Sequence, residues 1–426
     1  MNLIARVTRL QDIPVGENST YRLPLHSLWQ ALALGIILII AVTASVGQTA
    51  GRAEKQPDSL SAAEFTHLIN ELSEEGGFFP SDNFTSNESS YLTIVPKLEQ
   101  LGATGGAYIG VGPEQNFSYI ARIRPRIAFI VDIRRQAIIQ HLMYKAIFHL
   151  APTRVQFLSL LFSKPVPAAQ SVKKNQPKIP RPDDPVNDLM TYFSSIPADE
   201  KSGRDNLAAI KQVIREDFQF PLSATDETSL DYVYYSFRTS GLEIGFRLNP
   251  RRDGGGLGGG RFSGGGMGPF PTFKELIAQT DLSGKQCSFL ARAEDYDFIR
   301  SLHRKNLIIP VVGDFAGKKA LAAVGDYLRK NNFTVTAFYT SNVEMVLYRG
   351  GLFEGFAHNV KKLPINDHSL IIRAAFARYE HPARLSGYGT FTLLQRIPDF
   401  LRDFDEGSYR SYPDLINRHY ISAEKP

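Results

Sequence analysis

The chain has 426 residues, of which 43% are hydrophobic and 21% charged, as is typical of a globular protein with one large or two medium domains. Its 48 basic and 43 acidic side chains leave a formal charge of only +5, and the basic residues form short patches, so no nucleic-acid partner is expected. A single cysteine, Cys287, excludes an intramolecular disulfide framework and a cysteine-based zinc site, and the nine histidines show no HExxH spacing, so no metal site is predicted.

The N-terminal part of the chain predicts attachment to a membrane. After a tail at 1–26, residues 27–51 contain no charged side chain, and about 20 apolar residues suffice to cross a bilayer as a helix. We therefore expect a single-pass transmembrane anchor, with a signal peptide cleaved after Ala44 as the alternative. Basic residues flank the stretch almost equally, and a small excess before it favours a main domain outside the cytoplasm.

The first part of the main domain, residues 52–164, contains a strand–turn–helix–strand pattern. The apolar run "GAYIGVG" leads into the helical stretch "PEQNFSYIARI", and a second apolar run, "RIAFIVD", ends at Asp132. Gly110 and Gly112 would let a ligand approach the backbone in front of the helix N-terminus. Asp132, 22 positions after Gly110, could accept hydrogen bonds from both hydroxyls of a ribose. Gln115 stands where a dinucleotide motif needs glycine, which disfavours NAD.

Polar side chains precede this unit in the stretch "FPSDNFTSNE". Thr85 with Glu88 three positions later forms a capping-box pattern, which predicts a helix over about 87–101. A turn and a helix cap would explain the polar residues of this stretch. The alternative is a lid segment that reaches the ligand, and its residues would be Ser81, Asp82, Asn83 and Asn87.

Residues 165–303 are expected to interrupt the domain as a helical insertion. A Pro- and Lys-rich connection opens it, and helical patterns follow near 204–218, 229–239 and 287–304. Between them, ten of the sixteen residues that start at Asp253 are glycine. The pattern lacks the lysine and hydroxyl residue of a phosphate-binding loop, so a flexible loop or lid is favoured.

Residues 304–426 return to alternating strands and helices. Apolar strands end at Asp314 and Ser341, and another strand is predicted at 368–376. Ser341 and Glu344 form a second capping-box pattern. The alternation predicts an α/β, Rossmann-like domain with a mostly parallel, doubly wound sheet. Such sheets bind ligands beyond the carboxyl ends of their strands, and the residues expected at those ends are Gly110, Asp132, Asp314 and Ser341.

With these motifs in place, the chain resembles the class I S-adenosylmethionine-dependent methyltransferases. "YIGVGPE" stands where that family has its glycine-rich first motif, "VVGDF" where it contacts adenine, and "YTSN" where its fourth motif lies beside the methyl donor. The resemblance implies S-adenosylmethionine as the cofactor, and its binding residues would be Gly110, Gly112, Glu114, Asp132, Asp314, Phe315, Ser341 and Asn342. The stretches "FPSDNFTSNE" and "GPEQNFSYIA" with "DIRR" also resemble a group of uncharacterised bacterial proteins, which supplies no activity.

Three classes of function follow. The first is a membrane-anchored, methyltransferase-like enzyme that binds S-adenosylmethionine or a related nucleoside. The second is a module that binds a nucleoside or another metabolite without turnover. The third is a structural role at the bacterial membrane, with the fold as a scaffold. S-adenosylmethionine is a cytoplasmic metabolite, so an exported main domain would argue against the first class.

Overall fold

The computed structural model describes residues 56–167, 177–248 and 270–423. The expected anchor at 27–51 and the glycine-rich stretch that starts at Asp253 both lie outside these ranges. Within the ranges, no helix combines the length and the apolar character that a membrane crossing needs.

A seven-stranded sheet forms the centre of the described part, in the order β5-β3-β2-β6-β7-β8-β9. The first five strands in this order are parallel, whereas β8 is antiparallel to β7 and β9 is antiparallel to β8. This confirms the prediction of an α/β fold with a mostly parallel sheet. The strands of the sheet are β2 (Ala107–Gly110), β3 (Ile127–Asp132), β5 (Ile308–Val312), β6 (Val335–Ser341), β7 (Leu370–Phe376), β8 (Thr390–Arg396) and β9 (Ile421–Ser422).

The strand order is the one expected of a doubly wound sheet. Counted along the chain from β2, the first six strands stand in the order 3-2-1-4-5-6, which is the order of Rossmann-like folds. The order reverses between β2 and β6, so a ligand crevice is expected at the carboxyl ends of these two strands. A separate two-stranded sheet pairs β1 (Ser81–Asp82) with β4 (Arg247–Leu248).

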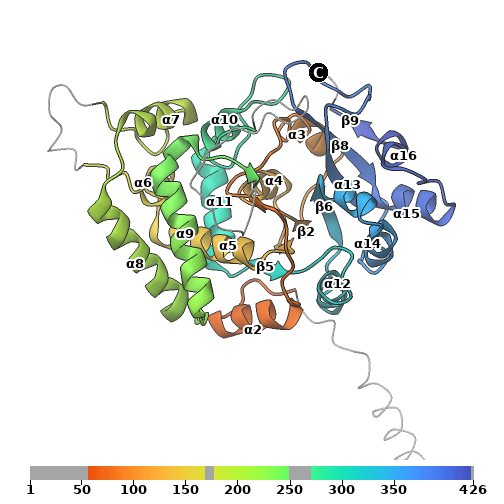
Figure 1. The fold of residues 1–426 in the computed structure, drawn as a ribbon, viewed down its shortest axis with the longest axis horizontal. Coiled ribbons are helices and arrows are strands. Elements are labelled where there is room, and N and C mark those ends of the chain that lie inside the picture. The colour runs from red at the N-terminus through yellow and green to blue at the C-terminus, as the bar shows by residue number, and fades with distance from the viewer. Residues whose placement is uncertain (1–55, 168–176, 249–269, 424–426) are drawn as a thin grey trace, which may run out of the picture. The chain divides into compact units, whose positions relative to one another are not determined.

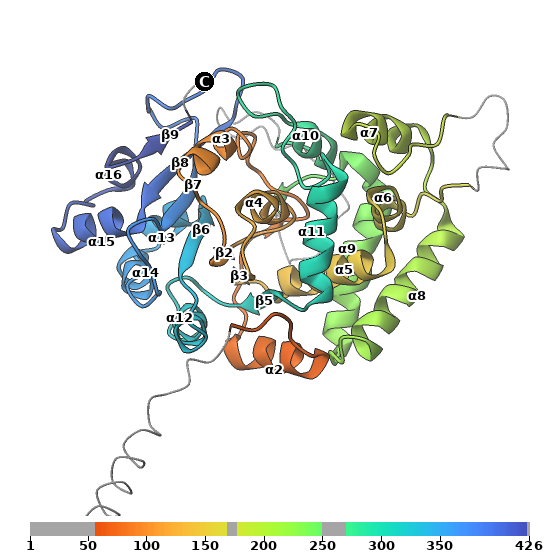
Figure 2. The same ribbon diagram turned by 180° about the vertical axis from the view of Figure 1, so that it is seen from behind.

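Helices cover both sides of the large sheet (Figure 1). On one side α11 contacts both α4 and α5, and on the other α12 packs against α14. The same layers are seen from behind in Figure 2. The helices are α2 (Ala62–Leu72), α3 (Val95–Gln100), α4 (Gln115–Ile123), α5 (Arg135–Leu150), α6 (Arg154–Phe162), α7 (Val186–Ser195), α8 (Glu200–Glu216), α9 (Ala224–Ser240), α10 (Phe273–Ala278), α11 (Ala293–Arg304), α12 (Ala320–Lys330), α13 (Val343–Arg349), α14 (Phe353–Val360), α15 (Ile397–Asp405) and α16 (Tyr412–Asn417).

The central strands are apolar because both of their faces are covered. All six residues of β3, IAFIVD, are buried, and so are all five of β5, which explains their continuous rather than alternating hydrophobic pattern. The first polar or glycine residues of these segments come at the carboxyl ends of the strands. These ends carry Asp132 and, just beyond β5, Gly313 and Asp314.

The insertion adds helices between β3 and β5. The patterns expected near 204–218 and 229–239 correspond to α8 and α9, which pack against each other and against α5. The pattern expected over 287–304 is helical only from Ala293, because Arg292 has an extended backbone. Among these helices, α9 contributes Tyr232 to the surroundings of the candidate site.

Candidate functional site

A cavity of about 270 Å³ lies at the carboxyl ends of β2, β3, β5 and β6. This is the point at which the strand order reverses, where doubly wound sheets bind their ligands. Small-molecule sites commonly have volumes from about 300 Å³ upward, so the cavity is close to the lower limit for a metabolite site. Residues that directly follow the four strands line it, among them Val111, Ile133, Gly313 and Asn342.

Most of the site residues expected from the sequence line this one cavity: Gly112, Asp132, Asp314, Phe315, Ser341, Asn342, Asn83 and Asn87. Gly110, Glu114, Ser81 and Asp82 are not among the lining residues. At Gly110, a Cβ atom would collide with Asn116 and Tyr108, so this glycine serves the packing of neighbouring side chains. Ser81 and Asp82 form the short strand β1 next to the cavity.

The glycine turn after β2 is held by side chains from behind. Gly112 has φ +81°, a conformation that favours glycine. The amide nitrogen of Asn116 donates to the carbonyls of Val111, Gly112 and Pro113 at 2.9, 3.1 and 2.8 Å. His141 Nε2 donates to the Gly112 carbonyl over 2.9 Å, and burial lowers the pKa of His141 to about 4, so its ring is neutral near pH 7. The turn is therefore a rigid wall of the cavity.

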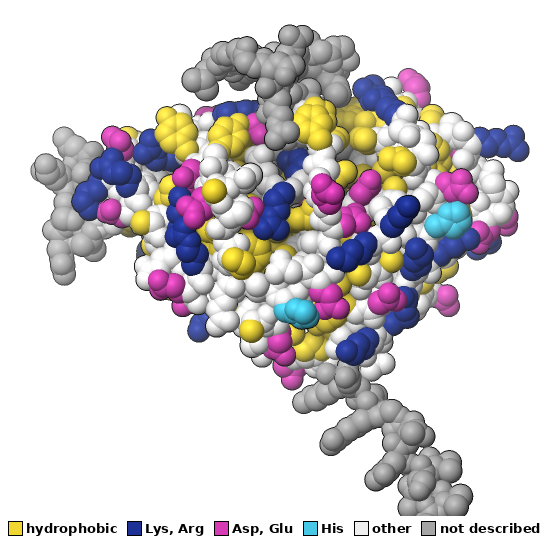
Figure 3. Space-filling model, turned by 60° about the horizontal axis from the view of Figure 1, so that its bottom comes forward, with side chains coloured by type: hydrophobic (Ala, Val, Ile, Leu, Met, Phe, Trp, Pro, Cys, Tyr) yellow, Lys and Arg dark blue, Asp and Glu magenta, His cyan; other side chains and the backbone are white. Residues whose placement is uncertain are grey.

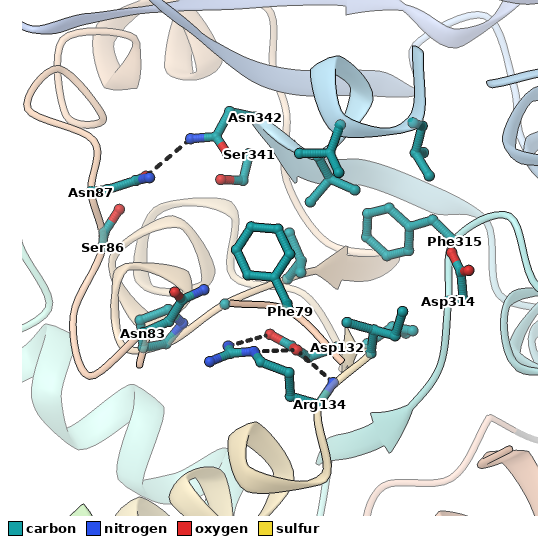
Figure 4. A pocket seen from close by; sticks show the side chains of 18 of the residues that line it. Phe79, Asn83, Ser86, Asn87, Asp132, Arg134, Asp314, Phe315, Ser341 and Asn342 are labelled. Atoms are coloured by element: carbon teal, nitrogen blue, oxygen red, sulfur yellow. Dashed lines mark hydrogen bonds and ion pairs between the residues drawn. The ribbon is translucent and has the colours of Figure 1, made fainter. Parts of the chain in front are cut away.

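Asp132 is already engaged by Arg134. Its carboxylate accepts hydrogen bonds from the Arg134 backbone N–H, Nε and Nη2 at 2.9, 3.1 and 2.9 Å (Figure 4). An ionised carboxylate has about four acceptor positions, so this arrangement leaves one. Asp132 can therefore accept one ribose hydroxyl, and the expected contact with both hydroxyls would require Arg134 to turn away.

The expected lid segment forms one wall of the cavity. Phe79, Asn83 and Asn87 line the cavity from this segment, and Figure 4 shows their side chains facing Asn342 and Asp132. Arg134 Nη1 donates to the Ser81 carbonyl over 3.2 Å. Asp82 accepts from Tyr232 Oη over 2.7 Å. The wall is therefore tied both to β3 and to the insertion helix α9.

Glu88 is a buried carboxyl directly behind the cavity. Its Oε1 accepts hydrogen bonds from Tyr339 Oη over 2.6 Å and from Ser341 Oγ, while Oε2 has no partner among the described residues. Burial raises the pKa of Glu88 to about 7, although the hydrogen bonds from Ser341 and Tyr339 oppose the rise. The capping-box prediction for Thr85 and Glu88 is wrong, because α3 begins only at Val95 and Glu88 points into the core.

The second capping-box prediction is wrong for a similar reason. Glu344 does not cap α13 but pairs with Arg373 of β7, with Nε–Oε2 and Nη2–Oε1 distances of 2.8 and 3.1 Å. Both side chains are almost fully buried. The pair holds α13, which supplies Val343, Val346 and Leu347 to the cavity wall, against the sheet.

Glu114 is a third buried carboxyl near the turn. It precedes α4 without making a side-chain cap, and neither of its oxygens has a hydrogen-bond partner among the described residues. Burial raises the pKa of Glu114 to about 8, with the nearby backbone amides of Glu114 and Ser86 opposing the rise. The resemblance implies that Glu114 contacts the cofactor. In the structure, however, Glu114 does not line the cavity.

Fold and cavity together define an α/β protein of the doubly wound class with a cavity at the carboxyl edge of its parallel strands. The described residues contain no group of three or more side chains placed to bind a metal ion. The chain belongs to the family described as "Domain of unknown function (DUF7790)", whose model matches residues 83–202 and 271–424. A search among the curated proteins found no match. The family segments include the cavity residues contributed by all four strands, whereas Phe78, Phe79 and Phe246 lie outside them.

Proposed function

We propose that the cavity binds a nucleoside-type small molecule, S-adenosylmethionine or a related nucleoside. The observation that supports this most directly is the position of the cavity, beside the glycine turn and at the reversal of the strand order. Doubly wound sheets bind nucleoside ligands at this point. S-adenosylmethionine would supply an electrophilic methyl group there, and the activity proposed with it is methyl transfer by a membrane-anchored enzyme.

The residues around the cavity suit most parts of such a ligand. Ile133 and Phe315 offer apolar surface for a flat base. Asp314 Oδ1 accepts from the Ala316 backbone N–H over 2.9 Å, which orients the carboxylate at the edge of the cavity for an amino group. Asp132, paired with Arg134, offers one acceptor position for a ribose hydroxyl. The fit is therefore best for a nucleoside held by its base and by one hydroxyl.

Calorimetry on the full-length chain in detergent tests the proposal. We expect S-adenosylmethionine or S-adenosylhomocysteine to bind with a micromolar dissociation constant, or about −8 kcal/mol. The absence of binding heat with millimolar ligand would refute the proposal.

Asp314→Ala is the sharper of two carboxylate substitutions. It should weaken nucleoside binding by about 1.5–3 kcal/mol, the range for hydrogen bonds to a charged acceptor, with little effect on folding because Asp314 is only partly buried. Asp132→Ala should weaken binding by a similar amount but also lower stability, because it leaves the buried Arg134 without its ion pair. Asp326→Ala is the matched control, since that side chain is 74% exposed on α12, and it should bind like the wild type.

A further inference from the structure

The charged residues at the cavity leave it with an excess of negative charge. Among the described lining residues, the charged side chains are Asp132, Arg134 and Asp314. Arg134 is neutralised by Asp132 over 2.9 Å, so Asp314 is left in excess. Glu88 adds a second carboxyl directly behind Ser341. In the described part of the cavity, an anionic ligand group would therefore meet no unpaired cation.

The remaining lining favours a positive charge as well. Phe79 and Phe315 point into the cavity (Figure 4), and Phe78 and Phe246 also line it. Ring faces attract cations, and aromatic walls are a recurrent means of binding ammonium groups. On the face in Figure 3, basic and acidic side chains are interspersed among apolar ones, with no large patch of one charge.

Ser341 lines the cavity and is hydrogen-bonded to Glu88 behind it. Its hydroxyl proton is used in the hydrogen bond to Glu88 Oε1, so its lone pairs are what a ligand meets. Its φ of +55° is uncommon for a serine, and such conformations persist where the surrounding structure enforces them. Glu88 has no cationic partner and an unpaired Oε2 among the described residues, which is costly for a buried carboxylate.

We infer that the cavity selects nucleosides whose positively charged group, such as an ammonium or a sulfonium, lies close to Ser341. Glu88 is the counter-ion of this group. Nucleotides with phosphate groups bind more weakly. The inference rests on the proposed nucleoside site and adds the charge of its ligand.

Binding should then be linked to a proton. Among the described residues, four tyrosines interact electrostatically with Glu88, and burial raises the pKa of each above its ordinary value: Tyr108, Tyr119, Tyr339 and Tyr412. Glu88, whose pKa burial raises to about 7, is thus the group in this cluster that changes charge near neutral pH. A bound cation favours its ionised form, so binding at pH 7 should release about half a proton. Affinity for cationic ligands should increase from pH 6 to pH 8.

Four adenosine ligands of different charge test the inference by calorimetry on the full-length chain in detergent. S-adenosylmethionine carries a sulfonium and sinefungin an ammonium at the corresponding position, S-adenosylhomocysteine a neutral sulfur, and adenosine monophosphate a phosphate. We expect both cationic ligands to bind roughly 10-fold or more tightly than S-adenosylhomocysteine, the scale of one charge-assisted or cation–π contact. Adenosine monophosphate should bind most weakly.

Glu88→Gln assigns the effect to the carboxyl. In this variant the preference for cationic ligands should fall to about 2-fold or less, and the proton release should disappear, whereas Glu99→Gln, an exposed control on α3, should retain both. If Glu88→Gln does not fold, the pH dependence in the wild type decides. A ratio of S-adenosylmethionine to S-adenosylhomocysteine affinity that does not change between pH 6 and pH 8 would overturn the role of Glu88.

The outcomes separate this inference from the proposed function. If S-adenosylhomocysteine binds as tightly as the cationic ligands, or adenosine monophosphate more tightly, the charge preference is wrong although nucleoside binding is confirmed. If no adenosine ligand binds, the nucleoside site is wrong, and trimethylphenylammonium is compared with its neutral isostere tert-butylbenzene by saturation-transfer NMR. Binding of the cation alone, lost in Glu88→Gln, then supports a cation site, and the absence of any preference overturns it.

Discussion

Replacing Glu114 by glutamine should remove a large part of the pH dependence of this protein's stability. Glu114 is 1% exposed, and burial raises the pKa of its carboxyl from 4.5 to about 8. The folded state therefore keeps a proton that the unfolded chain releases near pH 4.5. Between pH 4.5 and about pH 8 the folded state thus binds more protons than the unfolded chain. The free energy of unfolding should therefore fall as the pH rises through this range.

The width of this pH range limits how much the free energy of unfolding can change. At 1.36 kcal/mol for each pH unit, the rise from 4.5 to about 8 gives an upper limit of about 5 kcal/mol. Glutamine has the same size and cannot ionise, and an unpaired buried amide would cost about 1–3 kcal/mol at every pH. Only the difference between two pH values therefore reports on the carboxyl.

Urea unfolding at pH 5 and pH 8.5, followed by circular dichroism, measures this difference. The wild type should lose several kcal/mol more than Glu114→Gln between the two pH values, while Glu99→Gln, which removes an exposed carboxyl, should follow the wild type. A Glu114→Gln protein whose stability falls as steeply as that of the wild type would show that Glu114 ionises normally, and would refute the reasoning.

Arg134→Met should lower the free energy of unfolding by about 3–5 kcal/mol, because it leaves Asp132 buried without its partner; a loss below 1 kcal/mol in urea unfolding would contradict this. Gly112→Val and Gly102→Val should both be strained, since φ is +81° and +67° at these glycines, but calorimetry should find ligand binding lost only in the first, which alters the cavity wall. The expected anchor at 27–51 should keep the full-length chain in the membrane pellet during alkaline carbonate extraction, and a mature N-terminus near Ser45 would instead show cleavage.

The position of the cavity on the sheet could be predicted from the sequence. Gly112, Asp132, Asp314 and Ser341 each follow or end an apolar run, and the runs alternate with helical patterns. Alternation of this kind indicates parallel strands, and parallel strands bring their carboxyl ends to one edge. Hydrophobic periodicity and strand direction are local properties that the order of residues determines, so the residues of one cavity could be grouped although they are far apart in the chain.

The partners of the carboxyl groups were decided only by the tertiary structure. Glu88 and Glu344 both match a local capping pattern, yet they turn inward to Ser341 and Arg373, which lie 253 and 29 positions away in the chain. Asp132 is paired with Arg134, although its place at a strand end suggested a free acceptor. A sequence motif contains only residues that are close together in the chain, whereas the energy of a buried carboxyl depends on the atoms that surround it in space. The charge of the cavity therefore follows from how distant segments pack around it.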